Sequence, residues 1–194
     1  GADILRLWVS SADYRNDVAA SPRIMKQMVE AYRKIRNTLR FMLGNLYDFD
    51  SAKHMVSYQD LQEIDRWLLG KLAEIIEKVI KANDDYEFHV AYHAIHNFCT
   101  VELSAIYLDI VKDRLYVESK DSTARRAAQT VIYEALNALV RLLAPILVFT
   151  TEEIWPYIPG VKEDSTVQTE EMPVVKPEWK NEALTAKWKK ILNL

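Results

Sequence analysis

The sequence contains few of the residues that interrupt helices or cross-link chains. Its 194 residues include one cysteine, four glycines and six prolines. A single cysteine excludes an internal disulfide and is typical of a reducing compartment. Because glycine and proline are scarce, and several prolines stand at the edges of periodic segments, the sequence favours long helices over many short strands. The first residues do not show the pattern of a secretory signal.

A long uninterrupted apolar run and an excess of positive charge are also missing. The most apolar stretch, residues 131–149, contains Glu134, Asn137, Arg141 and Pro145 and does not fit a lipid-facing span. The formal net charge of −3 excludes a globally basic nucleic-acid binder, so any contact with a polyanion needs a local patch. We therefore expect a soluble, cytoplasmic protein with a globular core.

Apolar residues recur at helical spacing along almost the whole chain. The pattern predicts helices at about residues 3–11, 22–47, 59–83, 87–117, 121–145, 150–157 and 179–194. Ser21 and Pro22 fit the N-cap and the first position of the second helix. Thr150 with Glu153 fits a capping box. The sequence thus predicts an all-α fold: a helical bundle of about five main helices plus a short C-terminal extension.

The segment FHVAYHAIHNFC, residues 88–99, raises the question of a metal site. Its three histidines lie on one side of a helix, and imidazole with thiolate suits zinc. At about 100° per residue, however, Cys99 and Ile110 point with the apolar series, whereas Thr100 and Tyr107 lie beside the histidines. The E-x-x-H pair of a di-iron bundle is missing. We interpret His89, His93 and His96 as packing and hydrogen-bonding residues and predict no metal.

Five segments of the sequence have a recognisable character and order. They are GADILRLWVSSADY (1–14), YRKIRNTLRFMLGNLYDFD (32–50), IDRWLL (64–69), FHVAYHAIHNFCTVELSAIYLDIVKDRLY (88–116) and LLAPILVFTTEEIW (142–155). They resemble segments that follow one another in the same order in isoleucyl-tRNA synthetase. Pieces such as DRW and APIL also occur in valyl and other branched-chain enzymes, but RNTLRFMLGNL with YDFD, and FC-x2-ELS with YLDI-x-KDRLY, look like the isoleucyl version. From residue 1 to about 160 the chain resembles the helical anticodon-binding domain of this class I synthetase family.

The resemblance implies a domain that binds the anticodon stem and loop and positions isoleucine tRNA for ATP-dependent aminoacylation by a parent chain. Residues 1–20 would be a junction helix after the parent's catalytic domain, residues 21–158 the anticodon-binding bundle, and residues 159–194 a linker and the start of a further C-terminal region. HIGH-like and KMSKS-like motifs are missing from the sequence. We therefore expect a fragment that is inactive alone.

The same resemblance implies the partners and cofactors. The expected partners are isoleucine tRNA and the catalytic and C-terminal domains of the parent chain, in a monomer without membrane contact. ATP and magnesium belong to the parent enzyme. With one cysteine and no C-x-x-C, the sequence holds no cysteine-rich zinc module, so a zinc module of the parent, if it has one, lies beyond Leu194.

RNA loops are read by stacking and base-edge hydrogen bonds, while Lys and Arg hold phosphates. The candidate RNA-binding residues are Arg33, Arg36, Asn37 and Arg40 in the second helix; Lys112 and Arg114 in KDRLY; and Lys187, Trp188 and Lys190 near the C-terminus. The arginines have a structural alternative, because they could pair with acids such as Asp65 or Asp109. Trp188 could instead dock on a C-terminal module of the parent chain. Arg125 and Arg126 are interpreted as a solvated face.

Three other functions stay open from the sequence. The first is the same domain in a valyl-type relative. The second is a stand-alone helical scaffold for protein interactions, in which the arginines form only internal salt bridges. The third is a metal-binding bundle enzyme.

Overall fold

The computed structural model describes residues 1–192, and within them the chain is helical without a strand. The α-helices are α1 (Ala2–Ser11), α2 (Pro22–Gly44), α3 (Glu63–Asp84), α4 (Phe88–Asn97), α5 (Leu108–Ile110), α6 (Lys112–Tyr116), α7 (Thr123–Leu143), α8 (Val148–Ile154) and α9 (Glu182–Leu192). A π-helix, η2 (Phe98–Tyr107), continues α4. Short 3-10 turns are η1 (Tyr58–Asp60), η3 (Trp155–Tyr157), η4 (Val167–Thr169) and η5 (Pro177–Trp179). The predicted all-α fold is confirmed.

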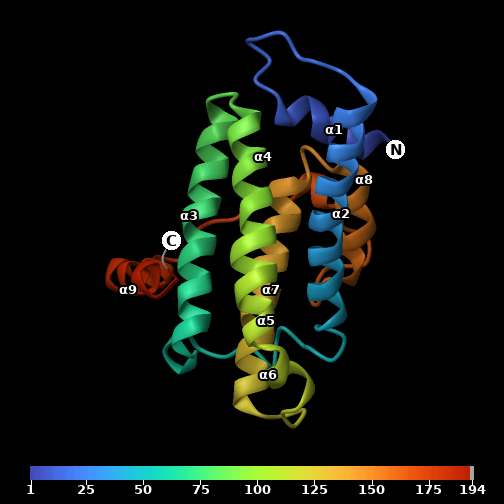
Figure 1. Cartoon of the computed structure of the whole chain (residues 1–194). Coiled ribbons are helices and arrows are strands. Elements are labelled where there is room, and N and C mark those ends of the chain that lie inside the picture. Colours follow the sequence, from blue (N-terminus) through green and yellow to red (C-terminus); the bar gives the residue numbers. More distant parts are fainter. Residues whose placement is uncertain (193–194) are drawn as a thin grey trace.

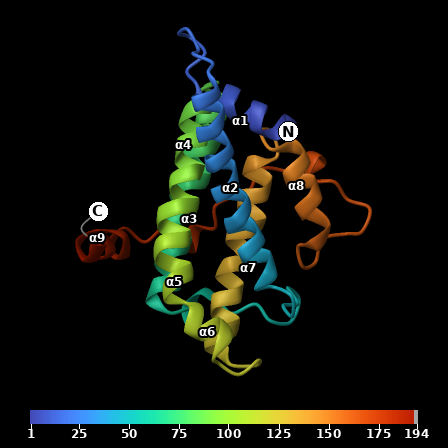
Figure 2. The same ribbon diagram turned by 45° about the vertical axis from the view of Figure 1, so that its right-hand side comes forward.

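Four long helical columns lie side by side: α2, α3, α4 with η2, and α7 (Figure 1). The helix α1 crosses one end of these columns, and α6 lies at the opposite end. The apolar stripe of each column meets the others in one core, where Leu39, Leu72, Leu103 and Leu136 have no exposed surface. Figure 2 shows α8 and α9 on opposite sides of the bundle.

Local sequence signals place several helix ends. The Ser21 side chain accepts a hydrogen bond from the Ile24 amide (3.2 Å), as its N-cap position predicts. Ser122 caps α7 in the same way. The predicted start of α3 at residue 59 is wrong, because Gln62 and Asp65 form a capping box that starts the helix at Glu63.

The cap of α8 differs from the predicted capping box. The helix begins at Val148, so Thr150 lies inside its first turn instead of at the N-cap. The buried Asp3 carboxylate of α1 takes the capping role: it accepts hydrogen bonds from the Thr150 amide (2.8 Å) and hydroxyl (2.6 Å) and from the Phe149 amide (3.3 Å). Residues at opposite ends of the sequence thus tie α1 to α8.

The fourth predicted helix is not a regular α-helix throughout. Its central part is the π-helix η2, and the chain breaks again at Val111 before α6. A π-helix turns by a different angle per residue than an α-helix. Side-chain directions predicted at 100° per residue are therefore wrong for residues well beyond Phe98. Tyr107, predicted beside the histidines, has no exposed surface, whereas Ile110, predicted in the core series, is 52% exposed. Cys99, which follows directly after Phe98, is buried as predicted.

The segment after α8 packs against the bundle. Val167 and Trp179, which lie in the segment 159–194 that was expected to be a linker and the start of a further C-terminal region, are both buried. The last predicted helix begins at Glu182, and its final two residues lie outside the described ones. None of the helices among residues 1–192 has both the length and the apolar character that crossing a membrane requires.

Candidate nucleic-acid interface

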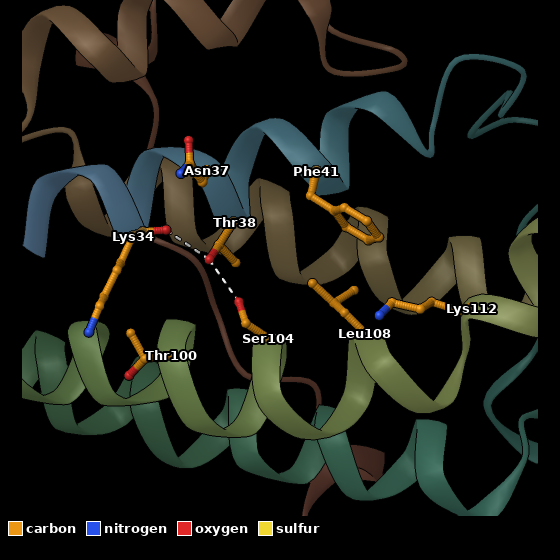
Figure 3. Close-up of a pocket in the computed structure, with 8 residues that line it drawn as sticks. All are labelled: Lys34, Asn37, Thr38, Phe41, Thr100, Ser104, Leu108 and Lys112. Atoms are coloured by element: carbon orange, nitrogen blue, oxygen red, sulfur yellow. Dashed lines mark hydrogen bonds between the residues drawn. The ribbon is translucent and has the colours of Figure 1, made fainter. Parts of the chain in front are cut away.

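A groove runs between α2 and the π-helix η2, and it continues to the start of α6. Its volume is about 510 Å³, within the size range of small-ligand pockets. Figure 3 shows the lining side chains, which are Lys34, Asn37, Thr38, Phe41, Thr100, Ser104, Leu108 and Lys112. In this view Lys34 and Lys112 stand at opposite ends, with hydroxyl groups between them and Phe41 facing Leu108.

A second groove of about 610 Å³ continues the first towards the α6 end of the bundle. The two share Asn37 and Phe41, so together they form one trough along α2. The second groove is also lined by Arg40, Gly44, Asn45, Tyr47, Leu115, Tyr116 and Arg125. We call the two grooves together the α2 trough.

Exposed aromatic rings stand at the α6 end of the α2 trough. Tyr47 is 81% exposed and Tyr116 is 63% exposed, although both line the second groove. Large aromatic side chains are more often buried than this. An exposed ring beside a basic groove is suited to stacking on an unpaired base.

The hydroxyl groups of the first groove form a short chain. The Thr38 Oγ1 atom lies 2.9 Å from the Lys34 carbonyl oxygen and 2.9 Å from Ser104 Oγ. The Thr100 hydroxyl donates to the His96 carbonyl (2.8 Å). These bonds fix the hydroxyl oxygens at the side of the groove instead of leaving them to rotate freely.

A buried ion pair holds the loop that carries Tyr47. The Asp48 carboxylate accepts two hydrogen bonds from the Arg125 guanidinium, at 2.8 and 2.9 Å, and one from Gln129 at 2.8 Å. These bonds, with Arg125 the larger cause, lower the pKa of Asp48 from 3.8 to about 2. Arg126 is also buried and donates to the Asp48 carbonyl. The predicted solvated face at these two arginines is therefore wrong.

A second buried network fixes α6. Arg114 donates to both carboxylate oxygens of Asp65, at 3.0 and 2.9 Å, and to the Ala124 carbonyl. The Tyr107 hydroxyl donates to the same carboxylate at 2.7 Å. Because the Arg114 side chain is only 12% exposed and its nitrogens already have partners, the structure gives it a structural role and removes it from the phosphate-binding candidates.

The predicted arginine stripe on α2 does not act as one unit. Arg40 lines the α2 trough, and no acid within residues 1–192 lies in salt-bridge range of it. Arg33 pairs with Glu30 on its own helix at 2.7 Å. Arg36 faces Glu153 of α8 at 3.9 Å. The predicted acid partners were different ones, since Asp65 is held by Arg114 and Asp109 pairs with Lys112.

The candidates near the C-terminus lie elsewhere. The helix α9 packs on α3, away from α2 (Figures 1 and 2). Lys187 pairs with Glu63 at 2.7 Å, and the Trp188 indole donates to the same carboxylate at 3.1 Å. The Trp188 ring lies on Trp67, with ring centroids 5.3 Å apart. Trp188 is thus a docking residue for α9, while Lys190 is exposed.

Of the residues that line the α2 trough, only Asn37, Arg40 and Lys112 were among the sequence-based candidates. The missing ones include Lys34, Phe41, Tyr47 and Tyr116. Lys34, Asn37 and Phe41 follow i, i+3, i+7 spacing, which was the available signal for a shared face. The exposure of Tyr47 and Tyr116 had no local signal, because it depends on how the loop and α6 are held.

The histidines form no ligand cluster with the cysteine. Within residues 1–192 no group of three or more His, Cys, Asp or Glu side chains is placed to hold a metal ion. Cys99 is fully buried, and burial raises the pKa of its thiol to about 12. Burial also lowers the pKa of His96.

Comparison with known proteins identifies relatives over the whole chain. An isoleucine–tRNA ligase of Desulfitobacterium hafniense (strain DSM 10664 / DCB-2) is 67% identical over 192 residues, covering 99% of this chain and 21% of that protein. One of Carboxydothermus hydrogenoformans is 59% identical over 194 residues, covering 100% and 21%. The chain thus spans about a fifth of the length of the curated relatives that it matches.

A solved structure supports the fold. The LeuRS of Agrobacterium radiobacter K84, crystallised in a ternary complex with tRNA and LeuAMS, superposes with a TM-score of 0.66 at 21% identity. The likeness covers 93% of this chain and 20% of that one. Residues 65–194 match the family described as the anticodon-binding domain of tRNA ligase. This match spans most of the chain, and the chain therefore belongs to the family of anticodon-binding domains of tRNA ligases.

Proposed function

We propose that the chain binds the anticodon stem and loop of isoleucine tRNA through the α2 trough. The observation that carries this proposal is the combination of a groove lined by Lys34, Arg40 and Lys112 with exposed rings of Tyr47 and Tyr116. Cations hold phosphates, and aromatic faces hold unpaired bases. Because the whole chain carries a net charge of −3, this local collection of cations is the feature that favours RNA.

The relatives support isoleucine tRNA as the cognate RNA. Both relatives described above carry the name isoleucine–tRNA ligase, and their identities of 59 and 67% extend over nearly the whole chain. This level of identity favours the isoleucyl family over the valyl-type alternative. The stand-alone scaffold is favoured only by the pairing of Arg33 and Arg36 with nearby acids.

The proposal includes a parent enzyme. In it, residues 21–158 are the RNA-binding bundle, residues 1–20 join it to a catalytic domain, and residues 159–194 lead to a further C-terminal region. The parent would be a monomeric cytoplasmic isoleucine–tRNA ligase that uses ATP and magnesium. This chain would contribute affinity and positioning, for which a groove lined by cations, hydroxyl groups and aromatic rings is suited.

The test is a binding titration of the chain against isoleucine tRNA and a non-cognate tRNA at several salt concentrations. We expect tighter binding of isoleucine tRNA and a linear fall of log K with log salt concentration. Binding that is absent, or that does not depend on salt, would overturn the RNA-binding proposal. Equal, salt-dependent binding of both tRNAs would overturn the isoleucine assignment.

A further inference from the structure

In the first groove of the α2 trough, the hydroxyl groups already donate their protons to other atoms of the protein. Thr38 Oγ1 lies 2.9 Å from the Lys34 carbonyl and 2.9 Å from Ser104 Oγ. A hydroxyl has one proton to donate, and a carbonyl oxygen can only accept. Both short contacts can be hydrogen bonds only if the Thr38 hydroxyl donates to the Lys34 carbonyl oxygen and the Ser104 hydroxyl donates to Thr38 Oγ1. The opposite direction would leave two acceptors 2.9 Å apart without a proton between them.

This direction decides what Ser104 can offer to a ligand. Its proton is directed at Thr38, so the lone pairs of its oxygen face the groove as acceptors. Thr100 is in the same state, because its hydroxyl donates to the His96 carbonyl at 2.8 Å. Both residues line the groove, and Ser104 is exposed (Figure 3). This side of the groove therefore accepts hydrogen bonds and does not donate them.

The rest of the groove completes a site for one nucleotide. Lys34 and Lys112 stand at its two ends, where ammonium groups can hold phosphates (Figure 3). The Phe41 ring and Leu108 form its apolar part, against which a flat base can lie. A volume of about 510 Å³ leaves room for a single nucleotide.

We propose that this groove takes one unpaired base and selects those with an exocyclic amino group. The relevant position is C6 of a purine or C4 of a pyrimidine. Adenine and cytosine carry their amino group there, whereas guanine and uracil have at that position a carbonyl oxygen that would meet the acceptors of Ser104 and Thr100. The π-helix η2 carries both hydroxyl residues, and α2 carries Thr38, which sets the direction of the Ser104 proton. This inference rests on the proposed RNA binding and adds to it a chemical preference at one position.

The test uses RNA hairpins whose loop is uridine except at one central position. This position holds adenosine, cytidine, uridine or purine riboside, which is adenosine without its amino group. We expect the chain to bind the adenosine and cytidine loops about three- to tenfold tighter than the other two, the ratio that one net hydrogen bond gives.

Three variants in the groove and one control variant separate the mechanism from a change of fold. Ser104→Ala and Thr38→Val should lower the affinity for the adenosine loop to that for the uridine loop, because one removes the acceptor and the other frees the Ser104 proton. Thr38→Ser keeps the hydroxyl and should retain the preference. Ser10→Ala, which removes a hydroxyl on α1 at the other end of the bundle, is the matched control and should change nothing. Melting temperatures of all variants confirm that the bundle is intact.

The outcomes distinguish this inference from the proposed function. Salt-dependent binding of isoleucine tRNA together with equal affinity for the four hairpins would overturn the amino-group preference alone. The amino-group preference alone would also be overturned if Ser104→Ala retained the preference for adenosine. It would likewise be overturned if isoleucine tRNA bound and none of the hairpins did. Failure of both the tRNA and the hairpins to bind would overturn the proposed function and this inference with it.

Discussion

Arg114 places two guanidinium nitrogens on the two carboxylate oxygens of Asp65, at 3.0 and 2.9 Å. The pair joins α6 to the first turn of α3, although 49 positions separate the residues in the sequence. The Asp65 side chain has no exposed surface, and it also accepts hydrogen bonds from the Tyr107 hydroxyl and the Gln62 amide. One carboxylate thus fixes three segments at the end of the bundle where Tyr116 lies.

Arg114→Leu should lower the free energy of unfolding by about 3–5 kcal/mol, because it leaves a buried carboxylate without its partner. Urea unfolding monitored by circular dichroism measures the change. Lys112→Gln, which removes an exposed pair with Asp109, should cost less than about 1 kcal/mol. Equal losses in the two variants would contradict a structural role that is specific to Arg114.

Arg40→Gln should reduce the salt dependence of tRNA binding. The side chain lines the α2 trough, and losing one phosphate contact should flatten the slope of log K against log salt by about 0.7. Arg33→Gln is the matched control on the same helix, because Arg33 pairs with Glu30 and does not line the trough. Titrations at several salt concentrations give both slopes. An unchanged slope for Arg40→Gln would remove it from the interface.

Tyr47→Leu and Tyr116→Leu should each weaken RNA binding by about 1–3 kcal/mol if the rings stack on bases. Both rings are exposed, so the melting temperature should hardly change. Phenylalanine at either position should preserve affinity, since it keeps the aromatic face. Tyr157→Leu is the control, because this ring is 70% exposed on the η3 turn outside the trough. A loss as large in Tyr157→Leu would argue against a localised interface.

The pair between Asp48 and Arg125 should make stability depend on pH in the acid range. Because the pKa of Asp48 is lowered from 3.8 to about 2 in the folded state, its contribution is complete above about pH 4 and is lost as the pH falls towards 2. A shift of this size corresponds to about 2 kcal/mol. Asp48→Asn should be less stable than the unmodified chain at neutral pH, and urea unfolding should show the difference narrowing below pH 4. A constant difference would refute this linkage.

Trp188→Ala should release α9 from the bundle. The substitution removes the ring that lies on Trp67 and the indole hydrogen bond to Glu63. We expect faster limited proteolysis between η5 and α9 and a red shift of tryptophan fluorescence as Trp67 becomes exposed. Lys190→Ala, an exposed change on the same helix, should leave both observables unchanged. Unchanged proteolysis in Trp188→Ala would show that other contacts hold α9.

The sequence predicted features that depend on near neighbours. The caps at Ser21 and Ser122 and the apolar stripes of α2, α3 and α7 arise within a few residues, so periodicity and capping rules find them. Candidates Arg40 and Lys112 came from the same local reasoning and do line the α2 trough.

Features that depend on distant residues were missed. Asp3 caps α8 across 147 positions, and Arg125 meets Asp48 across 77, so neither pair has a local signature. Arg114 and Arg125 were misinterpreted for the same reason. The local sequence around an arginine in an apolar helix does not show whether its guanidinium reaches solvent or a buried carboxylate. The exposure of Tyr47 and Tyr116 follows from those pairs.

The π-helix η2 sets the rotational orientation of the short helices α5 and α6 that follow it directly. A single residue turns an α-helix by about 100°, so the phase of α6 depends on the residue count of residues 98–107. Deleting one of them would swing Arg114 away from Asp65 and carry Lys112 and Tyr116 off the trough, while the composition of the helix hardly changed. The length of that segment is therefore a constraint on the position of α6, in addition to the contacts that its own side chains make.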